Sequence, residues 1–116
     1  MQYTFIGGDW NCVLSEWDSR SDSTPISKSL LSTVRTLNLR DIWWLKNRQV
    51  EYTFVRSNFG SRINRIYVKD LASCIKEVKT INVNFSDHSC VWSDFELKKN
   101  SKKGKRILEI KCLDVK

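Results

Sequence analysis

The sequence has only one histidine, His88, and it lacks several patterns that would assign a protein class at once. Its four cysteines show neither CxxC nor Cys/His ligand spacing, which favours reduced, buried thiols in an intracellular protein and argues against a zinc site. No apolar run approaches the roughly 18 residues of a membrane-spanning helix, so we expect no membrane partner. No charged segment precedes an apolar one at the N-terminus, so we expect no signal peptide and no secretion.

Positive charge is abundant, but it is concentrated at one end of the chain. Residues 98–116 carry eight basic and two acidic side chains, whereas residues 1–97 carry 12 and 11, so +6 of the net charge of +7 lies in the C-terminal segment. We expect residues 1–97 to form one globular domain and residues 98–116 to be a disordered basic tail, although weak alternation at 107–115 leaves a short strand open. Such a tail either binds nucleic acid through its charge or serves as a solvated end.

The hydrophobic pattern predicts an α+β domain with one mostly antiparallel sheet of about five strands and one main helix. Strands are expected at residues 3–7, 51–56, 63–69, 78–85 and 91–97. The helix is expected at 27–39, with Ser27 as its N-cap. The turn-forming segment 57–60 joins two of these strands and predicts a β-hairpin between them. The apolar segment 41–45 should pack against the helix, and residues 70–75 should form one helical turn.

Polar residues collect at the predicted strand ends, where ligands and chemistry are common in α/β sheets. They are Asp9, Asn11, Thr53, Asn64, Asp87 and His88. A histidine held by a neighbour can take a proton from water, and carboxylate and amide oxygens suit Mg²⁺ rather than zinc. The set therefore suits metal-assisted hydrolysis of a phosphodiester. Taken singly, each residue is explained at least as well by a cap, a turn or an ordinary buried position.

Four motifs along the chain give this set a family context. They are Gly8-Asp9-Trp10-Asn11, Glu51-Tyr52-Thr53-Phe54, the segment Ser61 to Tyr67, and Ser86-Asp87-His88-Ser89. They resemble, in order, the GDFN/GDWN, YTF/YTW, SRIDRIY and SDH motifs of the endonuclease/exonuclease/phosphatase superfamily. The last three are similar to its non-LTR (LINE-type) retrotransposon branch, and the resemblance covers roughly residues 3–97.

The resemblance implies part of a four-layer α/β sandwich whose ancestral activity is Mg²⁺-dependent nicking of DNA. The nick would prime reverse transcription, so the implied partners are DNA and a reverse transcriptase domain, and the implied location is the nucleus. His88 would be the general base or would stabilise the scissile phosphate, and Asp87 would bind the metal ion or orient the site. Asp9 would activate water or protonate the leaving oxygen, and Asn11 would bind a phosphate oxygen. Thr53 and Ser86 would contact the substrate backbone or support the site, and Arg62 would bind the substrate.

Two departures from the family pattern predict weak or absent activity. Asn64 stands where the SRIDRIY motif has the Asp that pairs with the catalytic histidine. An amide still accepts a hydrogen bond, but it cannot offset imidazolium charge and can favour the wrong tautomer, and such a change can cost about 10⁴ in rate. The family's first half, with an Asn, a metal-binding Glu, a Tyr and the second sheet, has no counterpart here. We therefore expect a C-terminal portion of the domain, with one apolar sheet face exposed and a need for its partner half.

Overall fold

The computed structural model describes residues 4–20, 24–96 and 106–108, the last as backbone only. The predicted α+β class is confirmed, with short helices among antiparallel strands. The elements are β1 (Thr4–Asp9), a 3₁₀ turn (Glu16–Asp18), α1 (Lys28–Thr36), β2 (Arg40–Asp41), α2 (Trp43–Lys46), β3 (Phe54–Arg56), β4 (Phe59–Ser61), β5 (Asn64–Lys69), a second 3₁₀ turn (Ala72–Cys74), β6 (Ile75–Asn82), β7 (Ser89–Phe95) and β8 (Arg106–Leu108).

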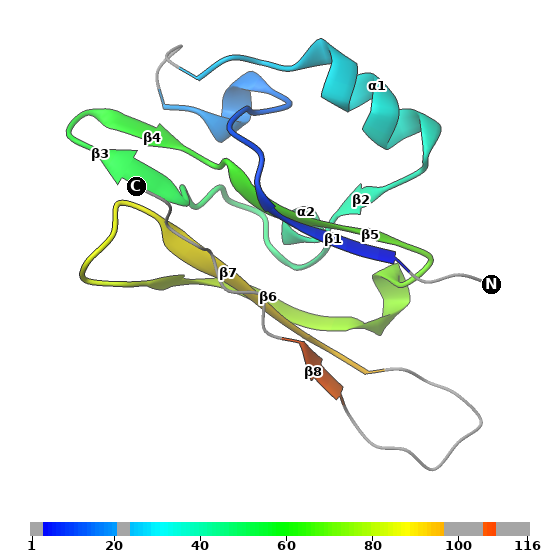
Figure 1. The fold of residues 1–116 in the computed structure, drawn as a ribbon. Helices are drawn as coiled ribbons and strands as arrows, with labels where there is room; N and C mark the ends of the chain where they lie inside the picture. Colours follow the sequence, from blue (N-terminus) through cyan, green and yellow to red (C-terminus); the bar gives the residue numbers. More distant parts are fainter. Residues whose placement is uncertain (1–3, 21–23, 97–105, 109–116) are drawn as a thin grey trace.

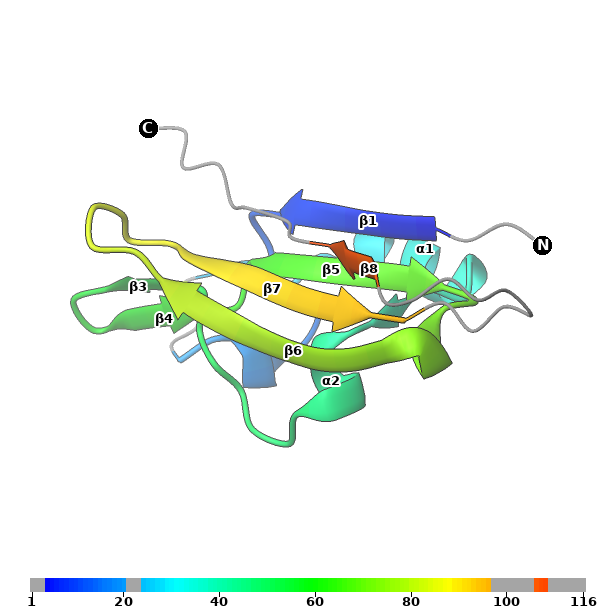
Figure 2. The same ribbon diagram turned by 90° about the horizontal axis from the view of Figure 1, so that it is seen from below.

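The strands form three small sheets rather than the single sheet that the sequence predicted. Their orders are β1-β5-β2, β3-β4 and β6-β7-β8, and every pairing is antiparallel. Figure 1 shows α1 on one side of the β1-β5-β2 sheet and the β6-β7 pair on the other. Figure 2, seen from below, shows β6 and β7 aligned nearly along the direction of β5. The described residues thus form three layers: a helix, a sheet and a second sheet.

The core lies between the β1-β5-β2 sheet and the β6-β7 pair. Ile66 and Val68 of β5 pack there with Val78 of β6 and Val91 of β7. We expected the second sheet to be missing and one apolar face to be exposed. In the structure, β6 and β7 supply that cover, because their apolar side chains face β5.

The predicted hairpin has a different second strand. β3 pairs with β4 through the two-residue turn Ser57-Asn58, in which Ser57 has a φ of 52°. The 63–69 strand, observed as β5, instead pairs with β1 on one side and β2 on the other. Its residues 64–68 are all buried, and this burial suits the central position of a sheet better than a two-stranded hairpin.

The segment 41–45 also packs elsewhere than predicted. Ile42 and Trp43 belong to the core cluster, and α2 contacts β6, so this segment covers the sheets rather than α1. The predicted N-cap of α1 is confirmed, because the Ser27 hydroxyl accepts a hydrogen bond from the Leu30 N–H at 3.1 Å. The predicted helical turn at 70–75 is present as the second 3₁₀ turn.

The C-terminal segment is described only in part. Residues 106–108, within the predicted basic tail, form β8 and pair with β7. The rest of 97–116 lies outside the described residues, and so does most of the weakly alternating run at 107–115. Neither helix in the described part of the chain has the length and apolar character needed to cross a bilayer.

Candidate active site

The segment containing His88 lies beside the segment containing Thr53. The Val55 N–H donates to the Asp87 carbonyl at 3.1 Å, and the Ser89 N–H donates to the Thr53 carbonyl at 2.6 Å. Phe54 stands opposite His88 in this pairing, and their ring centroids are 5.0 Å apart. Two motifs that are far apart in the sequence therefore form one extended platform, and its backbone hydrogen bonds fix where the imidazole projects.

Asn64 holds the imidazole of His88. The Oδ1 atom of Asn64 lies 2.9 Å from Nδ1 of His88, and Asn64 is only 2% exposed. An amide oxygen can only accept, so Nδ1 donates and Nε2 carries the lone pair. This is the tautomer that a general base needs. The amide was expected to favour the wrong tautomer; with its oxygen toward the ring, it favours the productive one.

Thr53 supports this pair from within the protein. Its hydroxyl accepts hydrogen bonds from the Ile63 N–H at 3.1 Å and the Asn64 N–H at 2.9 Å, and the residue is 1% exposed. These contacts satisfy two backbone donors just where β5 begins. Of the two roles open to Thr53, the geometry favours support of the site over contact with a substrate.

Asp9 and Asn11 lie at the neighbouring strand end. Asp9 stands directly opposite Asn64 in the register of β1 and β5, so its exposed carboxylate neighbours the His88–Asn64 pair. The carboxylate oxygen Oδ1 accepts a hydrogen bond from the Asn11 N–H at 2.9 Å, and Asn11 has a φ of 54°. This tight turn leaves Asn11 exposed just beyond Asp9.

Ser86 and Asp87 have different surroundings. The Ser86 hydroxyl accepts a hydrogen bond from the His88 N–H at 3.0 Å, which steadies the approach to the histidine. The Asp87 carboxylate lies 3.4 Å from Nε of Arg56. The predicted metal ligand therefore faces a cation, at a surface position where such a pair contributes little to stability.

A sequence comparison decides the family of this chain. Residues 2–88 match the sequence profile of the Endonuclease/Exonuclease/phosphatase family, a range that extends from before Asp9 to His88. The chain belongs to this family. The endonuclease/exonuclease/phosphatase family consists of nuclease-like and phosphatase hydrolases and is typically dependent on a divalent metal ion. No curated protein that was searched matches the chain.

The family's metal ion does not find a complete site among the described residues. Within residues 4–20 and 24–96, no group of three His, Cys, Asp or Glu side chains is placed to hold a metal ion. Asp87 faces Arg56, and the oxygen of Asn64 is directed at His88. These residues alone do not fit the ion, so any metal-dependent step would need ligands from elsewhere.

Arg62, predicted to contact substrate, is instead buried inside a network of carboxylates. It is 2% exposed and donates four hydrogen bonds, two to Asp18 and two to Asp41, with Nε of Arg62 and Oδ1 of Asp18 2.8 Å apart. Burial opposes its charge, but Asp41 and Asp18 outweigh that effect and raise the pKa of the guanidinium above its usual value. Since these hydrogen bonds direct its guanidinium into the protein, Arg62 ties three segments together rather than facing a ligand.

Sequence reasoning missed this network because nothing in the spacing links its members. Asp18 lies 44 residues and Asp41 lies 21 residues from Arg62. Asp18 sits in a polar loop and Asp41 opens an apolar segment, and neither context distinguishes a buried carboxylate from a solvated one. The sequence around Arg62 also gives no signal of its burial, because polar residues such as Ser61, Asn64 and Arg65 surround it.

Proposed function

We propose that the chain is the C-terminal portion of a LINE-type retrotransposon endonuclease whose inherited reaction, the nicking of DNA, is strongly reduced. The observation that carries this proposal is the contact between Asn64 and His88. It preserves the geometry of a histidine and its orienting partner, but it replaces the carboxylate of the family motif with a neutral amide.

The expected chemistry follows from the two nitrogen atoms of the ring. Nε2 takes a proton from the attacking water, and the imidazole becomes positively charged. Asn64 keeps the ring oriented through Nδ1 but contributes no negative charge to balance it. An amide that imposes the wrong tautomer at an orienting position slows such a reaction about 10⁴-fold. Because the oxygen of Asn64 keeps the productive tautomer, we expect a smaller loss, caused by the missing negative charge alone. Asp9, opposite Asn64, is the group we assign to activating water or protonating the leaving oxygen, with Asn11 on a phosphate oxygen.

Mg²⁺ and DNA belong to the same proposal. The ion would offset charge on the phosphate and the leaving oxygen. Because Asp87 faces Arg56, we propose that the remaining ligands come from the N-terminal half of the family domain. We further propose a reverse transcriptase domain as a partner and the nucleus as the place of action.

The test restores the missing carboxylate. Asn64→Asp should raise the nicking rate on supercoiled plasmid in Mg²⁺ by at least 10²-fold, measured with the chain alone and with an N-terminal half of the family supplied in trans. The control Asn58→Asp makes the same chemical change at an exposed turn and should leave the rate unchanged. Adding His88→Ala to Asn64→Asp should remove the gain. The proposal fails if Asn64→Asp has the wild-type rate in both settings, or if cleavage persists without His88.

A second candidate function rests on charge alone. Residues 98–116 carry a net +6, and such a segment binds nucleic acid without sequence preference and with strong salt dependence. Deleting them should abolish retention of DNA at low salt if this segment is the binding element. Retention that survives the deletion assigns binding to the folded domain.

A further inference from the structure

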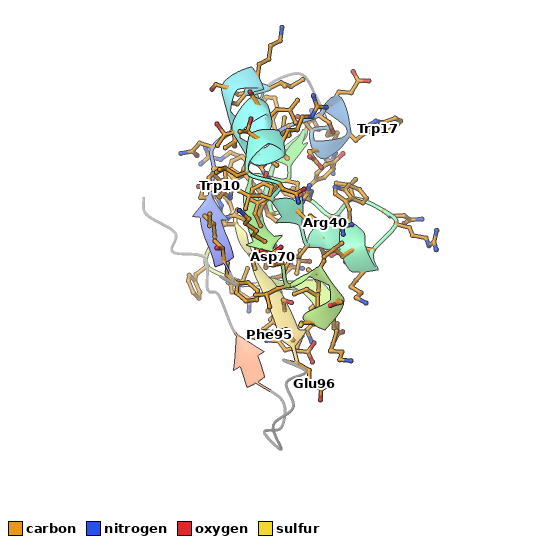
Figure 3. The ribbon with its side chains drawn as sticks, turned by 90° about the vertical axis from the view of Figure 1, so that its right-hand side faces the viewer. Trp10, Trp17, Arg40, Asp70, Phe95 and Glu96 are labelled. Carbon is orange, nitrogen blue, oxygen red and sulfur yellow. The ribbon has the colours of Figure 1, made fainter. Side chains whose placement is uncertain are left out.

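A shallow groove away from His88 is walled by two exposed indoles. It has a volume of about 710 Å³ and is lined by Ser15, Trp17, Trp44, Arg48, Gln49 and Val50. Trp17 is 74% exposed and Trp44 is 43% exposed. Figure 3 shows Trp17 at the periphery of the molecule, beside the 3₁₀ turn that carries it. Two large aromatic side chains around one groove make an apolar surface of the kind that ligands cover.

The same buried arginine contacts one wall of the groove and the backbone beside the other. The guanidinium of Arg62 lies over the ring of Trp44, 5.4 Å from its centroid. Arg62 also binds the carboxylate of Asp18, the residue that follows Trp17 in the 3₁₀ turn, and its own N–H donates to the Asp18 carbonyl at 2.7 Å. Arg62 thus holds the ring of Trp44 and the backbone beside Trp17, so the Trp44 wall is preorganised, which lowers the entropic cost of binding there.

The charges around the groove favour an anionic ligand with a flat ring. Arg48 is the charged side chain of the lining, and it is exposed. The nearby carboxylates of Asp18 and Asp41 are already paired with Arg62. An aromatic ring can therefore stack on an indole while a neighbouring phosphate meets Arg48. An apolar peptide segment would leave Arg48 and Gln49 without partners.

We propose that this groove binds an unpaired base of a single nucleic-acid strand, with Trp17 and Trp44 as the stacking surfaces and Arg48 on the adjacent phosphate. The base must be unpaired because the faces of a base in a duplex are covered by its stacked neighbours. Base–aromatic stacking of this type tolerates any sequence. The inference stands apart from hydrolysis at His88, since it needs neither the imidazole nor a metal ion.

The test distinguishes binding through the bases from binding through the phosphates. Fluorescence anisotropy of the full chain would compare a labelled 12-nucleotide oligo-dT with an abasic strand of the same length. Any basic segment contacts both strands alike, so the ratio of affinities isolates the bases. We expect oligo-dT to bind about tenfold more tightly, and Trp17→Ala to remove most of that preference. Phe85→Ala is the matched control, because Phe85 is an 86% exposed aromatic residue outside the lining and should leave the ratio unchanged.

Each outcome decides for or against the groove. Trp44→Ala should act like Trp17→Ala, and circular dichroism would show whether either variant unfolds. Trp17 is so exposed that its truncation leaves the core intact, so this variant decides the question even if Trp44→Ala is unstable. Equal wild-type affinity for the two strands overturns the proposal and leaves the groove to a protein partner. A preference that Trp17→Ala retains overturns it as well, by placing the bases elsewhere on the chain.

Discussion

Arg62 and Asn64 lie two residues apart and are equally buried, yet their electrostatic surroundings are opposite. Each is 2% exposed. Arg62 keeps its full charge and balances it with the carboxylates of Asp18 and Asp41. Asn64 faces a histidine with a neutral amide, at the position where the family motif has a carboxylate. Charge is therefore retained where it joins segments of the fold and is absent where the proposed reaction would use it.

This difference separates residues needed for stability from residues needed for the proposed reaction. The Arg62 network connects the 3₁₀ turn at Asp18, the β2 residue Asp41 and the segment leading into β5, so its loss should be felt as instability. The Asn64–His88 contact is a single hydrogen bond at the rim of the domain, so its alteration should be felt mainly in chemistry. Mutations of Arg62 and of Asn64 therefore test whether stability and activity can be changed separately in this chain.

The largest effect is expected from Arg62→Met. The substitution leaves the carboxylates of Asp18 and Asp41 in the protein without their cation, a situation that costs about 3–5 kcal/mol in buried pairs. We expect the free energy of unfolding in urea to fall by that amount. Trp44 also loses the guanidinium that lies on its ring.

The matched control for this variant is Arg56→Met, which makes the same chemical change at the surface. Nε of Arg56 lies 3.4 Å from Asp87, but the Arg56 side chain is 64% exposed. The expected loss is below about 1 kcal/mol. Similar losses of unfolding free energy in the two variants would show that the buried network contributes no more than a surface pair. The contrast between Arg62 as a stability residue and Asn64 would then be wrong.

An intermediate effect is expected from Thr53→Val, because Thr53 binds the backbone of Ile63 and Asn64, between the Arg62 network and His88. The variant keeps the shape of the side chain but removes the acceptor for the N–H groups of Ile63 and Asn64. Leaving buried donors unsatisfied costs about 1–3 kcal/mol, measured by chemical unfolding. Thr53→Ser retains the hydroxyl and should recover most of that loss. If Thr53→Val keeps the wild-type stability and Thr53→Ser is the destabilised variant, methyl packing rather than the hydrogen bonds governs this position.

The sequence carried more information about which residues lie close together than about what surrounds them. The motif order predicted one site from residues as distant as Asp9 and His88, and the structure places Asn64 between them in register and contact. The period-two pattern at 63–69 correctly indicated a strand. It could not name the partners of that strand, because alternation records burial and not which strand lies alongside.

Long-range polar contacts were the least predictable feature. The pairing of Arg62 with Asp18 and Asp41 depends on how the loop after β1 folds back beside β4, where the Arg20 N–H donates to the Gly60 carbonyl at 2.7 Å. The part that folds back, residues 10–20, has no periodic signature and contains no proline or glycine that would mark it. Buried ion pairs of this kind are visible only once the backbone is placed.

The smallest effect concerns Tyr67 of β5, whose buried hydroxyl lies a few residues farther along the chain. Burial is the main cause that raises the pKa of its hydroxyl above the usual 10.0, although Arg65, whose Nε donates to that hydroxyl at 2.8 Å, opposes the rise. The unfolded chain therefore loses this proton first as pH rises. The corresponding stability is complete below about pH 10 and is lost as the pH passes through the folded-state pKa, with a slope of at most about 1.4 kcal/mol per pH unit.

Urea unfolding between pH 8 and 11.5 would measure this loss, with Tyr67→Phe as the comparison. The variant should be less stable at pH 8, because Nε of Arg65 loses its acceptor, but its stability should fall less steeply above pH 10. Lysines and the other tyrosines titrate in both proteins, so the difference between the two slopes isolates Tyr67. Parallel slopes would mean that the phenol titrates alike in the folded and unfolded chains. Burial of Tyr67 beside Arg65 would then have no net effect on the ionisation of its hydroxyl.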